Sequence, residues 1–363
     1  MIPLITYLEK LEDPRKNQGK RYDLIPLLSC CFIATICGYK NYSGFSEFCK
    51  NYKEKLLDVL DFRGKNTPCA STFFNVLKRV GIKNFEKVIS EWVESFLDKT
   101  EVISIDGKTL RGTKKQGGKY NHLLSAFVNR LGITLYQNPV ETKTNEITGV
   151  IELLKGITIE GKIFTMDALL TQKAIAKKIV SNKGDYIMVA KDNQAFLKED
   201  IELLVYSDEN YVITESYIEN DKGHGRIETR KITITESKDI IEFEGVQQVF
   251  MVERWIKRNG KETYEKIFGL SSLSKAKADA KSIFSMLRSH WSIENRSHWV
   301  RDVTYDEDRS QVKDSKIAEF MALFRNIAIG LIRFDGFVNI SKANKFYASN
   351  PILALPLLTM KIK

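Results

Sequence analysis

The chain has 363 residues, of which 43% are hydrophobic and 28% charged, a composition typical of a folded protein with a sizeable core and not of a disordered or fibrous chain. Its 56 Lys and Arg residues outnumber its 46 Asp and Glu residues, giving a net charge of +10. That charge favours a polyanionic partner, although many basic proteins bind no nucleic acid. The N-terminus lacks a secretory pattern, and the most apolar stretch, 24–39, is shorter than the ~20 residues of a membrane span. We therefore expect a cytoplasmic protein without membrane contact.

The cysteines also bear on the compartment. Their number is odd and none forms a C-x-x-C pair, so we expect reduced thiols that are buried as small hydrophobic residues. The five are Cys30, Cys31, Cys37, Cys49 and Cys69.

The first 98 residues read as a helical domain. Apolar residues at helical spacing predict a buried helix over 24–39. Pro68 with the following Ser71 and Thr72 indicates a second helix start, and Gly81 separates that helix from another. The two helices within 68–97 are either a DNA-reading helix-turn-helix or a plain bundle that packs on the next domain, and the bundle is slightly favoured.

After residue 99 the pattern becomes mixed α/β. In chain order, the elements expected are a strand at 102–105, a hairpin of 122–128 with 133–136, a helix at 147–154, a strand at 163–166, a helix at 173–180 and a strand at 186–190. Strands that alternate with helices after an initial hairpin predict a mixed sheet. We expect this domain to span 99–340, with a β-rich insertion at about 205–273 and a C-terminal tail at 341–363.

Two aspartates each follow one of these strands. Asp106 comes directly after the strand at 102–105, and Asp167 directly after the strand at 163–166. Gly107 leaves room for a nucleic-acid backbone beside Asp106. Two-metal phosphoryl transfer needs several carboxylates that converge on one point, and hard oxygen ligands suit Mg²⁺ or Mn²⁺. The alternative is that each aspartate caps a turn.

A third carboxylate lies in a helix expected over about 283–303. There Glu294 shares one helical face with five other residues, and Met286, Ile293 and Val300 form the adjacent core stripe. The five are Leu287, His290, Trp291, His298 and Arg301. Two alternatives remain: a surface pair between Glu294 and a neighbouring His or Arg, and, more weakly, a zinc site with His290 and His298.

Basic residues gather beside the first aspartate and again near residue 224. The stretch 106–119 carries Lys108, Arg111, Lys114, Lys115 and Lys119, and glycines there would let backbone approach phosphate. It lacks the spacing of a Walker A loop, so no nucleotide cofactor is expected. The alternative is a solvated loop. The segment 222–230 is either a second basic patch or a hairpin turn, and 191–194 either touches phosphate or caps the next helix.

Taken together, these residues resemble the transposases of bacterial insertion sequences, in the branch that contains the H-repeat-associated proteins. The motifs run in order over almost the whole chain: Leu11–Arg15, Ser104–Lys108 with Arg111-Gly112, Lys143–Ile147, Met166–Ala168 with Thr171-Gln172, Lys191–Gln194, Gly223–Arg230, His290–Asn295 with His298-Trp299, and Asp302–Asp308.

The resemblance implies a ribonuclease-H-like core with an N-terminal transposase-associated domain over 1–98. It implies a DDE triad of Asp106, Asp167 and Glu294, which binds two Mg²⁺ (or Mn²⁺) ions. Related transposases carry a Tyr, an Arg and a Lys around the glutamate; here His290 stands near the Arg position and Arg301 near the Lys position. Asp302, Glu307 and Asp308 are rival ligands.

The activity implied is cleavage of DNA at the element ends and transfer of the 3′ end into target DNA. The partners implied are terminal inverted repeats, target DNA and a second copy of the chain, at the bacterial nucleoid. The residues expected at DNA are Lys108, Arg111, Lys114, Lys115, Lys191, His224, Arg226, His290, Asn295, His298 and Arg301. The alternatives are a nuclease or junction resolvase on the same core, and a non-catalytic DNA-binding remnant of a mobile element.

Overall fold

A computed structural model gives the structure of the chain. The residues that it describes are 2–18, 20–55, 60, 66–113, 121–140, 146–206, 214–223, 225–237 and 240–359. The chain forms two compact units, each built from separate segments. The first consists of Met1–Asp98, Gly107–Ile157 and Ser292–Lys363, and the second of Lys99–Asp106 and Thr158–Trp291.

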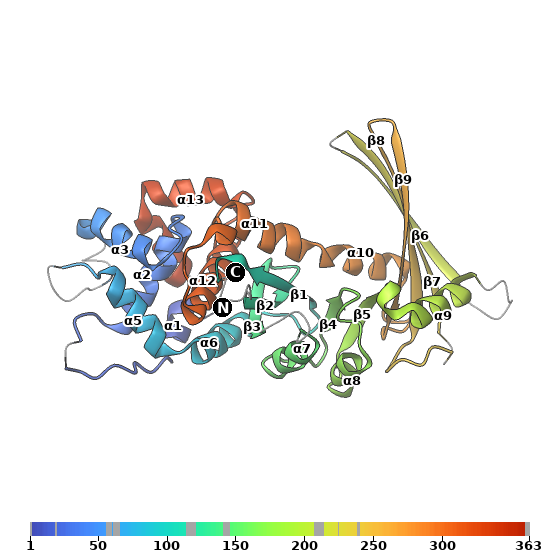
Figure 1. Ribbon diagram of the computed structural model, residues 1–363, viewed down its shortest axis with the longest axis horizontal. Helices are drawn as coiled ribbons and strands as arrows, with labels where there is room; N and C mark the ends of the chain where they lie inside the picture. Colours follow the sequence, from blue (N-terminus) through green and yellow to red (C-terminus); the bar gives the residue numbers. More distant parts are fainter. Residues whose placement is uncertain are drawn as a thin grey trace. The chain divides into compact units, whose positions relative to one another are not determined.

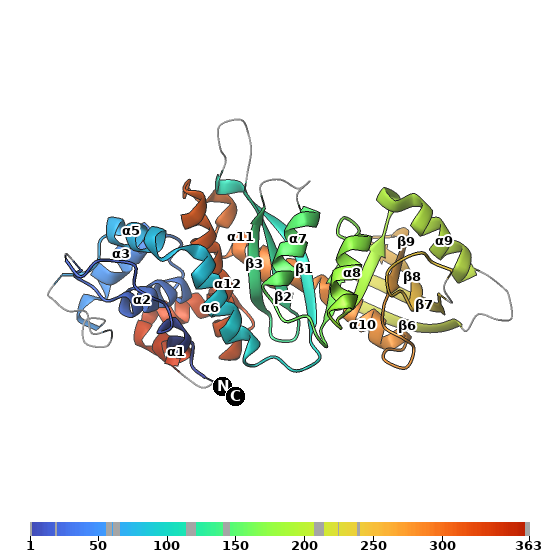
Figure 2. The same cartoon turned by 90° about the horizontal axis from the view of Figure 1, so that it is seen from below.

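The first unit gathers helices from both ends of the chain (Figures 1 and 2). Those from the N-terminal part are α1 (Leu4–Leu8), α2 (Leu24–Ile36), α3 (Tyr42–Asn51), α5 (Ala70–Val80) and α6 (Ile82–Glu94). The long α12 (Ser315–Phe334) lies among them, and its Phe324 ring meets Phe32, Phe45 and Phe85 at centroid distances of 4.9 to 5.9 Å. Helix α2 is almost wholly buried, which confirms the buried helix expected there.

The cysteines belong to this helical core, with one exception. All five are free thiols, and four of them are buried. Cys69 is exposed, so its predicted burial is wrong. It is the N-cap residue of α5, and its backbone is extended, outside the helix proper.

Helices α5 and α6 meet at Gly81, whose φ of 79° lies in the left-handed region that favours glycine. α6 buries Phe85, Ile89 and Trp92 and packs against β3 (Ile133–Val140). A recognition helix must expose one face to a DNA groove. The structure therefore favours the bundle over the helix-turn-helix.

The first unit also holds the predicted hairpin and the C-terminal helices. Strand β2 (Asn121–Val128) pairs antiparallel with β3, and α7 (Glu146–Lys155) packs on both. The segment expected as a tail forms α13 (Ile340–Ser349) and α14 (Leu355–Thr359), joined by the short helix η6 (Pro351–Ala354). Several of its apolar side chains are buried, among them Tyr347, Leu357 and Leu358.

The second unit is built on a mixed sheet. Strand β1 (Val102–Leu110) pairs in parallel with β4 (Ile163–Met166), and β4 pairs in parallel with β5 (Asp185–Ala190). An antiparallel series then continues from β5 through β9 (Lys261–Ser271), β8 (Gln248–Arg258), β7 (Arg226–Glu236) and β6 (Thr214–Gly223). The helices of this unit are α8 (Lys173–Ser181), α9 (Ala195–Tyr206) and α10 (Ala280–His290), with a short η3 (Asp192–Gln194) before α9.

The hydrogen-bonded order of the described strands is β3-β2-β1-β4-β5-β9-β8-β7-β6. Its first five strands, a hairpin beside parallel strands, form the expected ribonuclease-H-like core. The β-rich insertion is confirmed, and it continues the sheet at β5 instead of forming a separate layer. One expectation is wrong: β1 does not end at Ile105 but runs on to Leu110, and only its pairing with β4 stops there.

The helical stretch before residue 303 is continuous but irregular. After α10 the backbone forms a π-helical segment η4 (Glu294–His298) and then α11 (Trp299–Val303). The core stripe is confirmed, because Ile293 and Val300 are buried. A single helical wheel over 283–303 is wrong, since each π turn adds a residue and rotates all later side chains. Among the described residues, no helix is long and apolar enough to cross a membrane.

Candidate active site

The two aspartates stand side by side in the second unit. In the parallel pairing of β1 with β4, Ile105 lies opposite Met166, so Asp106 and Asp167 are the next residues along neighbouring strands. Adjacent strands lie about 4.8 Å apart. Asp106 is partly buried and Asp167 is exposed.

A short hydrogen-bonded series shows which face of the sheet they occupy. The Ser104 hydroxyl lies 2.9 Å from that of Thr165, which lies 3.0 Å from Nδ1 of His290 on α10. Side chains two residues apart on a strand share a face. Asp106 and Asp167 therefore lie on the face that carries α10.

Four polar contacts fix the loop after Asp167. Its Oδ1 accepts hydrogen bonds from the backbone N–H groups of Leu169 and Leu170 at 3.1 and 3.3 Å. One carboxylate oxygen of Asp167 therefore caps the turn, as the alternative expected. Asn193 donates to the Ala168 carbonyl at 2.9 Å, and Gln194 donates to the Thr171 carbonyl. The motif at 191–194 thus holds the loop that carries Asp167.

His290 lies below this pair and not at a DNA-facing surface. It is buried, and its Nδ1 is engaged by Thr165. Burial lowers the pKa of His290, although nearby Asp167 and Thr165 act in the opposite direction. Its predicted DNA contact is therefore corrected: the imidazole is a buried, largely neutral group at neutral pH.

Glu294 belongs to the first unit and is exposed. It is the first residue of the π-helical segment, four residues after His290 along the helical backbone. Its side chain makes no hydrogen bond or ion pair with any residue that the structure describes, so the surface-pair alternative has no support there. The zinc alternative has none either, because no three His, Cys, Asp or Glu side chains among the described residues gather closely enough to hold one ion.

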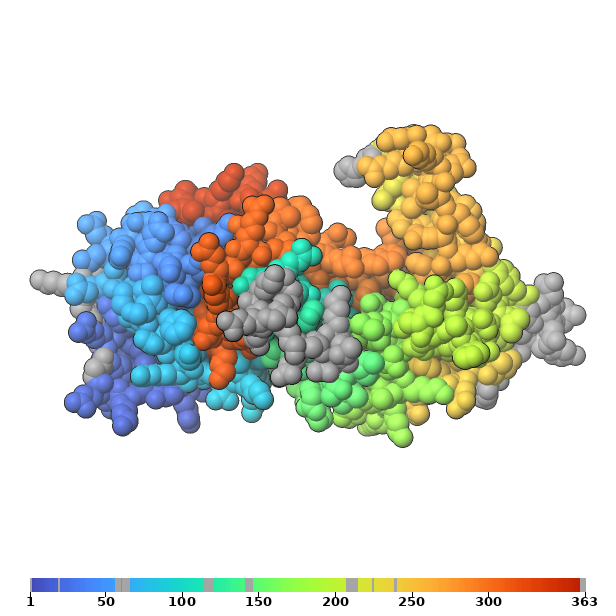
Figure 3. Space-filling view, in the orientation of Figure 1, coloured from blue at the N-terminus to red at the C-terminus, as the bar shows by residue number. Residues whose placement is uncertain are grey.

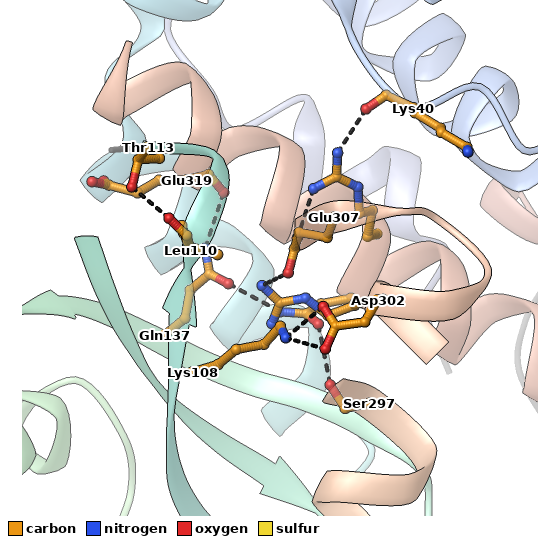
Figure 4. A network of polar contacts seen from close by, with 12 residues as sticks. Lys40, Lys108, Leu110, Thr113, Gln137, Ser297, Asp302, Glu307 and Glu319 are labelled. Atoms are coloured by element: carbon orange, nitrogen blue, oxygen red, sulfur yellow. Dashed lines mark hydrogen bonds and ion pairs between the residues drawn. The ribbon is translucent and has the colours of Figure 1, made fainter. Parts of the chain in front are cut away.

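Each rival carboxylate lies beside a cation of the first unit, and Figure 4 shows two of the three, Asp302 and Glu307. Asp302 accepts from Nζ of Lys108 at 2.6 Å through both oxygens. Asp308 lies 3.5 Å from Arg111. Glu307, in the short helix η5 (Glu307–Arg309), pairs with two arginines, as described next.

Glu307 is buried between Arg301 at 2.7 Å and Arg325 at 2.6 Å. Burial alone raises the pKa of Glu307, but the two arginines outweigh it and lower the pKa to about 2. The predicted phosphate contact of Arg301 is therefore wrong, because its guanidinium is fully buried in this pair. Lys108 is likewise buried against Asp302, so it too is not at the surface expected for DNA.

Other residues expected at DNA remain accessible. Arg111 has 70% of its side chain exposed despite its pair with Asp308. Lys191 and Asn295 are exposed, and His298 is half-buried. Arg226 is partly exposed and lies 3.1 Å from Glu228. Lys114, Lys115 and His224 lie outside the described residues.

Glu146 lies near Gly107, and the sequence predicted no role of its own for it. A Cβ added to Gly107 would lie 2.8 Å from Oε1 of Glu146, which is buried at the start of α7. The absence of a side chain at Gly107 thus makes room for Glu146, whereas we expected it to make room for a nucleic-acid backbone. The signal available in the sequence was the motif 143–147 alone, and residues 143–145 lie outside the described residues.

With this geometry in hand, comparison with known proteins identifies the family. The family model "Transposase DDE domain" matches residues 97–331, and "DDE_Tnp_1-associated" matches residues 5–93. The chain belongs to the DDE transposase family.

Two relatives illustrate the family. The chain is 31% identical to "Putative transposase YncI" of Escherichia coli O157:H7, over 91% of this chain and 87% of that one. It is 27% identical to "H repeat-associated putative transposase YhhI" of Escherichia coli strain K12, over 92% and 90%. A solved piggyBac transposase synaptic complex with hairpin DNA aligns over 97% of this chain and 77% of its own, at 10% identity and a TM-score of 0.45.

The paired aspartates suit a hard divalent cation. Mg²⁺ and Mn²⁺ prefer carboxylate oxygens; Asp106 lies within β1, and Asp167 follows directly after β4. Within the described parts of the chain, no three His, Cys, Asp or Glu side chains gather closely enough to hold one ion. The described residues thus show two neighbouring carboxylates of the right chemistry and not a complete cluster.

Proposed function

We propose that this chain cleaves DNA at the ends of an insertion sequence and joins the freed 3′ ends to target DNA. Asp106, Asp167 and Glu294 are the acidic residues of its active site. The observation that carries the proposal is the adjacency of Asp106 and Asp167 on paired parallel strands, in a chain of the DDE transposase family.

Asp106 and Asp167 would hold divalent Mg²⁺ or Mn²⁺. Two such ions, when bound, promote attack on phosphorus and neutralise the charge that develops on the leaving oxygen. The strands fix the two carboxylates before DNA binds, so little reorganisation is needed during reaction. His290 stays neutral in its buried place and positions Thr165 two residues before Asp167.

Glu294 is the third acidic residue of the proposal. Three features support it: its exposure, the absence of a described partner, and its place four residues after His290. The π-helical segment begins at this residue, and such segments are frequent at functional sites. Arg111, Lys191 and Asn295, all exposed, would contact phosphates. Two element ends must be joined together, so we expect two copies of the chain on DNA.

Replacement of Asp106 by Asn tests the proposal directly. Asp106→Asn removes one anionic ligand but keeps size and hydrogen-bonding capacity. We expect Mg²⁺-dependent strand cleavage to fall by at least about 1,000-fold, while affinity for the terminal-repeat duplex stays within about twofold. Cleavage is measured on a labelled duplex and affinity by anisotropy.

The matched control is Asp98→Asn, since Asp98 is an exposed aspartate paired with Arg130 at 3.1 Å. It should cleave at the native rate. Native-level cleavage by Asp106→Asn would overturn the assignment. A strand-transfer assay with a pre-cleaved terminal-repeat oligonucleotide separates a transposase, which joins DNA, from a nuclease or resolvase, which only cleaves.

A further inference from the structure

The four strands β6 to β9 form a part of the sheet whose two faces differ. At its inner end, α10 covers one face, where Ile283, Phe284 and Leu287 pack on Ile232 and Val252. α9 covers the opposite face there, and its Tyr206 hydroxyl contacts Met251 Sδ at 3.1 Å. Figure 1 shows no helix beside the outer ends of β8 and β9, and Figure 3 shows the same end as a projecting column.

Ion pairs stiffen this outer end on the α10 face. The strand register aligns Glu219, Arg230, Arg254 and Glu265 in one row across all four strands. Glu228, fully buried, lies 2.6 Å from Arg230 and also pairs with Arg254. Because these groups neutralise one another within the sheet, this row itself offers little free charge to a partner.

The opposite face of the outer end is aromatic and exposed. Trp255 and Tyr264 are direct cross-strand neighbours, 41% and 48% exposed, with ring centroids 5.3 Å apart and planes inclined by 32°. Ile218 and Ile227, both at least half exposed, have the same orientation. We call the surface made by Trp255, Tyr264, Ile218 and Ile227 the aromatic face.

Basic side chains surround the aromatic face. The register puts four lysines on this side of the sheet, against two glutamates: Lys222, Lys231, Lys257 and Lys266, with Glu253 and Glu262. Lys257 pairs with Glu262 at 2.8 Å, and Glu253 accepts from the Tyr264 hydroxyl at 2.6 Å. Lys266 instead lies near the rings of Tyr206 and Tyr264. The excess positive charge therefore flanks exposed rings.

We propose that the aromatic face binds a single-stranded segment of DNA, whose bases stack on Trp255 and Tyr264 and whose phosphates lie by Lys231 and Lys266. Stacking needs base faces that a duplex hides, and lysines around open rings match a polyanion that exposes such faces. The inference rests on the proposed function, because an enzyme that cleaves and joins DNA acts at strand ends, where base pairs open more readily than within a continuous duplex.

Binding of a labelled twenty-nucleotide oligo-dT strand to the full chain, without divalent metal, tests this. Stacking of one base on an aromatic ring is worth about 1–3 kcal/mol, and 1.4 kcal/mol is about tenfold in affinity. We expect the double variant Trp255→Ala, Tyr264→Ala to bind at least about tenfold more weakly. The pair Trp255→Phe, Tyr264→Phe keeps both rings and should bind within about threefold of the native chain.

Trp299→Ala is the matched control, because Trp299 is also an exposed tryptophan but lies in the first unit. It should bind oligo-dT as the native chain does. Native affinity of the double alanine variant, or an equal loss with Trp299→Ala, overturns the inference. If the alanine pair unfolds, Lys231→Glu with Lys266→Glu gives the second measurement, and unchanged oligo-dT affinity there also overturns it.

Failure of this inference is distinguishable from failure of the proposed function. The double alanine variant should still bind the terminal-repeat duplex in anisotropy. Loss of oligo-dT binding alone concerns the aromatic face. A native chain that neither cleaves nor joins terminal-repeat DNA contradicts the proposed function instead, whatever its affinity for oligo-dT.

Discussion

At the scale of single residues, burial decides which charged groups are available for chemistry. Glu307 is a carboxylate near the family motifs, but two arginines enclose it and its pKa falls to about 2. It therefore stays ionised, as a structural anion paired with two arginines. Asp167 has no cation paired with it among the described residues and stays exposed, which leaves its carboxylate available for the proposed metal ion.

Glu86 is the opposite case, a carboxylate that burial keeps protonated. It lies on α6, 3% exposed. Burial raises its pKa to about 8; a hydrogen bond from Gln137 lowers it and nearby Glu319 raises it further. The folded chain thus binds this proton more tightly than the unfolded chain does.

A pH-dependent stability follows. Because the folded-state pKa of Glu86 lies above its unfolded value of 4.5, its contribution is complete below about pH 4.5 and is lost as pH rises to about 8. Glu86→Gln should remove this component, whose slope is at most about 1.4 kcal/mol per pH unit. Urea unfolding from pH 5 to 8 measures it, with Glu91→Gln on the same helix as control. Parallel curves for Glu86→Gln and the native chain would contradict the prediction.

At the scale of elements, two irregularities mark the site. β1 runs past the end of its partner β4, which leaves Asp106 in a strand while its neighbour Asp167 starts a loop. The π-helical segment opens the helix at Glu294. The end of β4 leaves Asp167 outside the strand pairing, and the π turn adds one residue to the regular helical repeat.

The turn after β1 gives a prediction at this scale. Gly112 lies in the short helix η1 (Arg111–Thr113), and a Cβ there would collide with the carbonyl oxygen of Ser310. Gly112→Ala should lower the free energy of unfolding by about 1–3 kcal/mol, the usual cost of overpacking. Gly223→Ala is the control, since nothing lies within 4 Å of a Cβ there. An equal effect in both variants, measured by urea unfolding, would refute the close approach.

At the scale of the whole molecule, the net charge of +10 favours a polyanionic partner, and the number of phosphate contacts sets how affinity for DNA would depend on salt. Each phosphate that the protein neutralises contributes about −0.9 to the slope of log affinity against log salt on duplex DNA.

We expect Arg111→Ala and Lys191→Ala each to reduce that slope by about one, because both side chains are exposed. Lys155→Ala should leave the slope unchanged, since Lys155 is paired with Glu152 at 2.6 Å. Anisotropy with a terminal-repeat duplex between 50 and 200 mM salt provides the measurement. Unaltered slopes for Arg111→Ala and Lys191→Ala would remove both residues from the DNA contact set.

The sequence by itself determined the class of fold and most elements. Periodicity predicted the buried helix α2, the hairpin of β2 and β3, and strands β4 and β5, because these patterns depend on neighbours a few residues apart. The family motifs pointed to Asp106, Asp167 and Glu294.

Only the tertiary structure decided which charges are free. Lys108, His290 and Arg301 all looked like DNA contacts in the sequence, yet each is buried. The partners of Lys108 and His290 are 194 and 125 residues away along the chain, and Arg301 pairs with the nearby Glu307. The same holds for the aromatic face, where Trp255 and Tyr264 become neighbours only through strand register. Charge and residue type are local properties, whereas burial and pairing depend on contacts across long sequence separations, which no local pattern records.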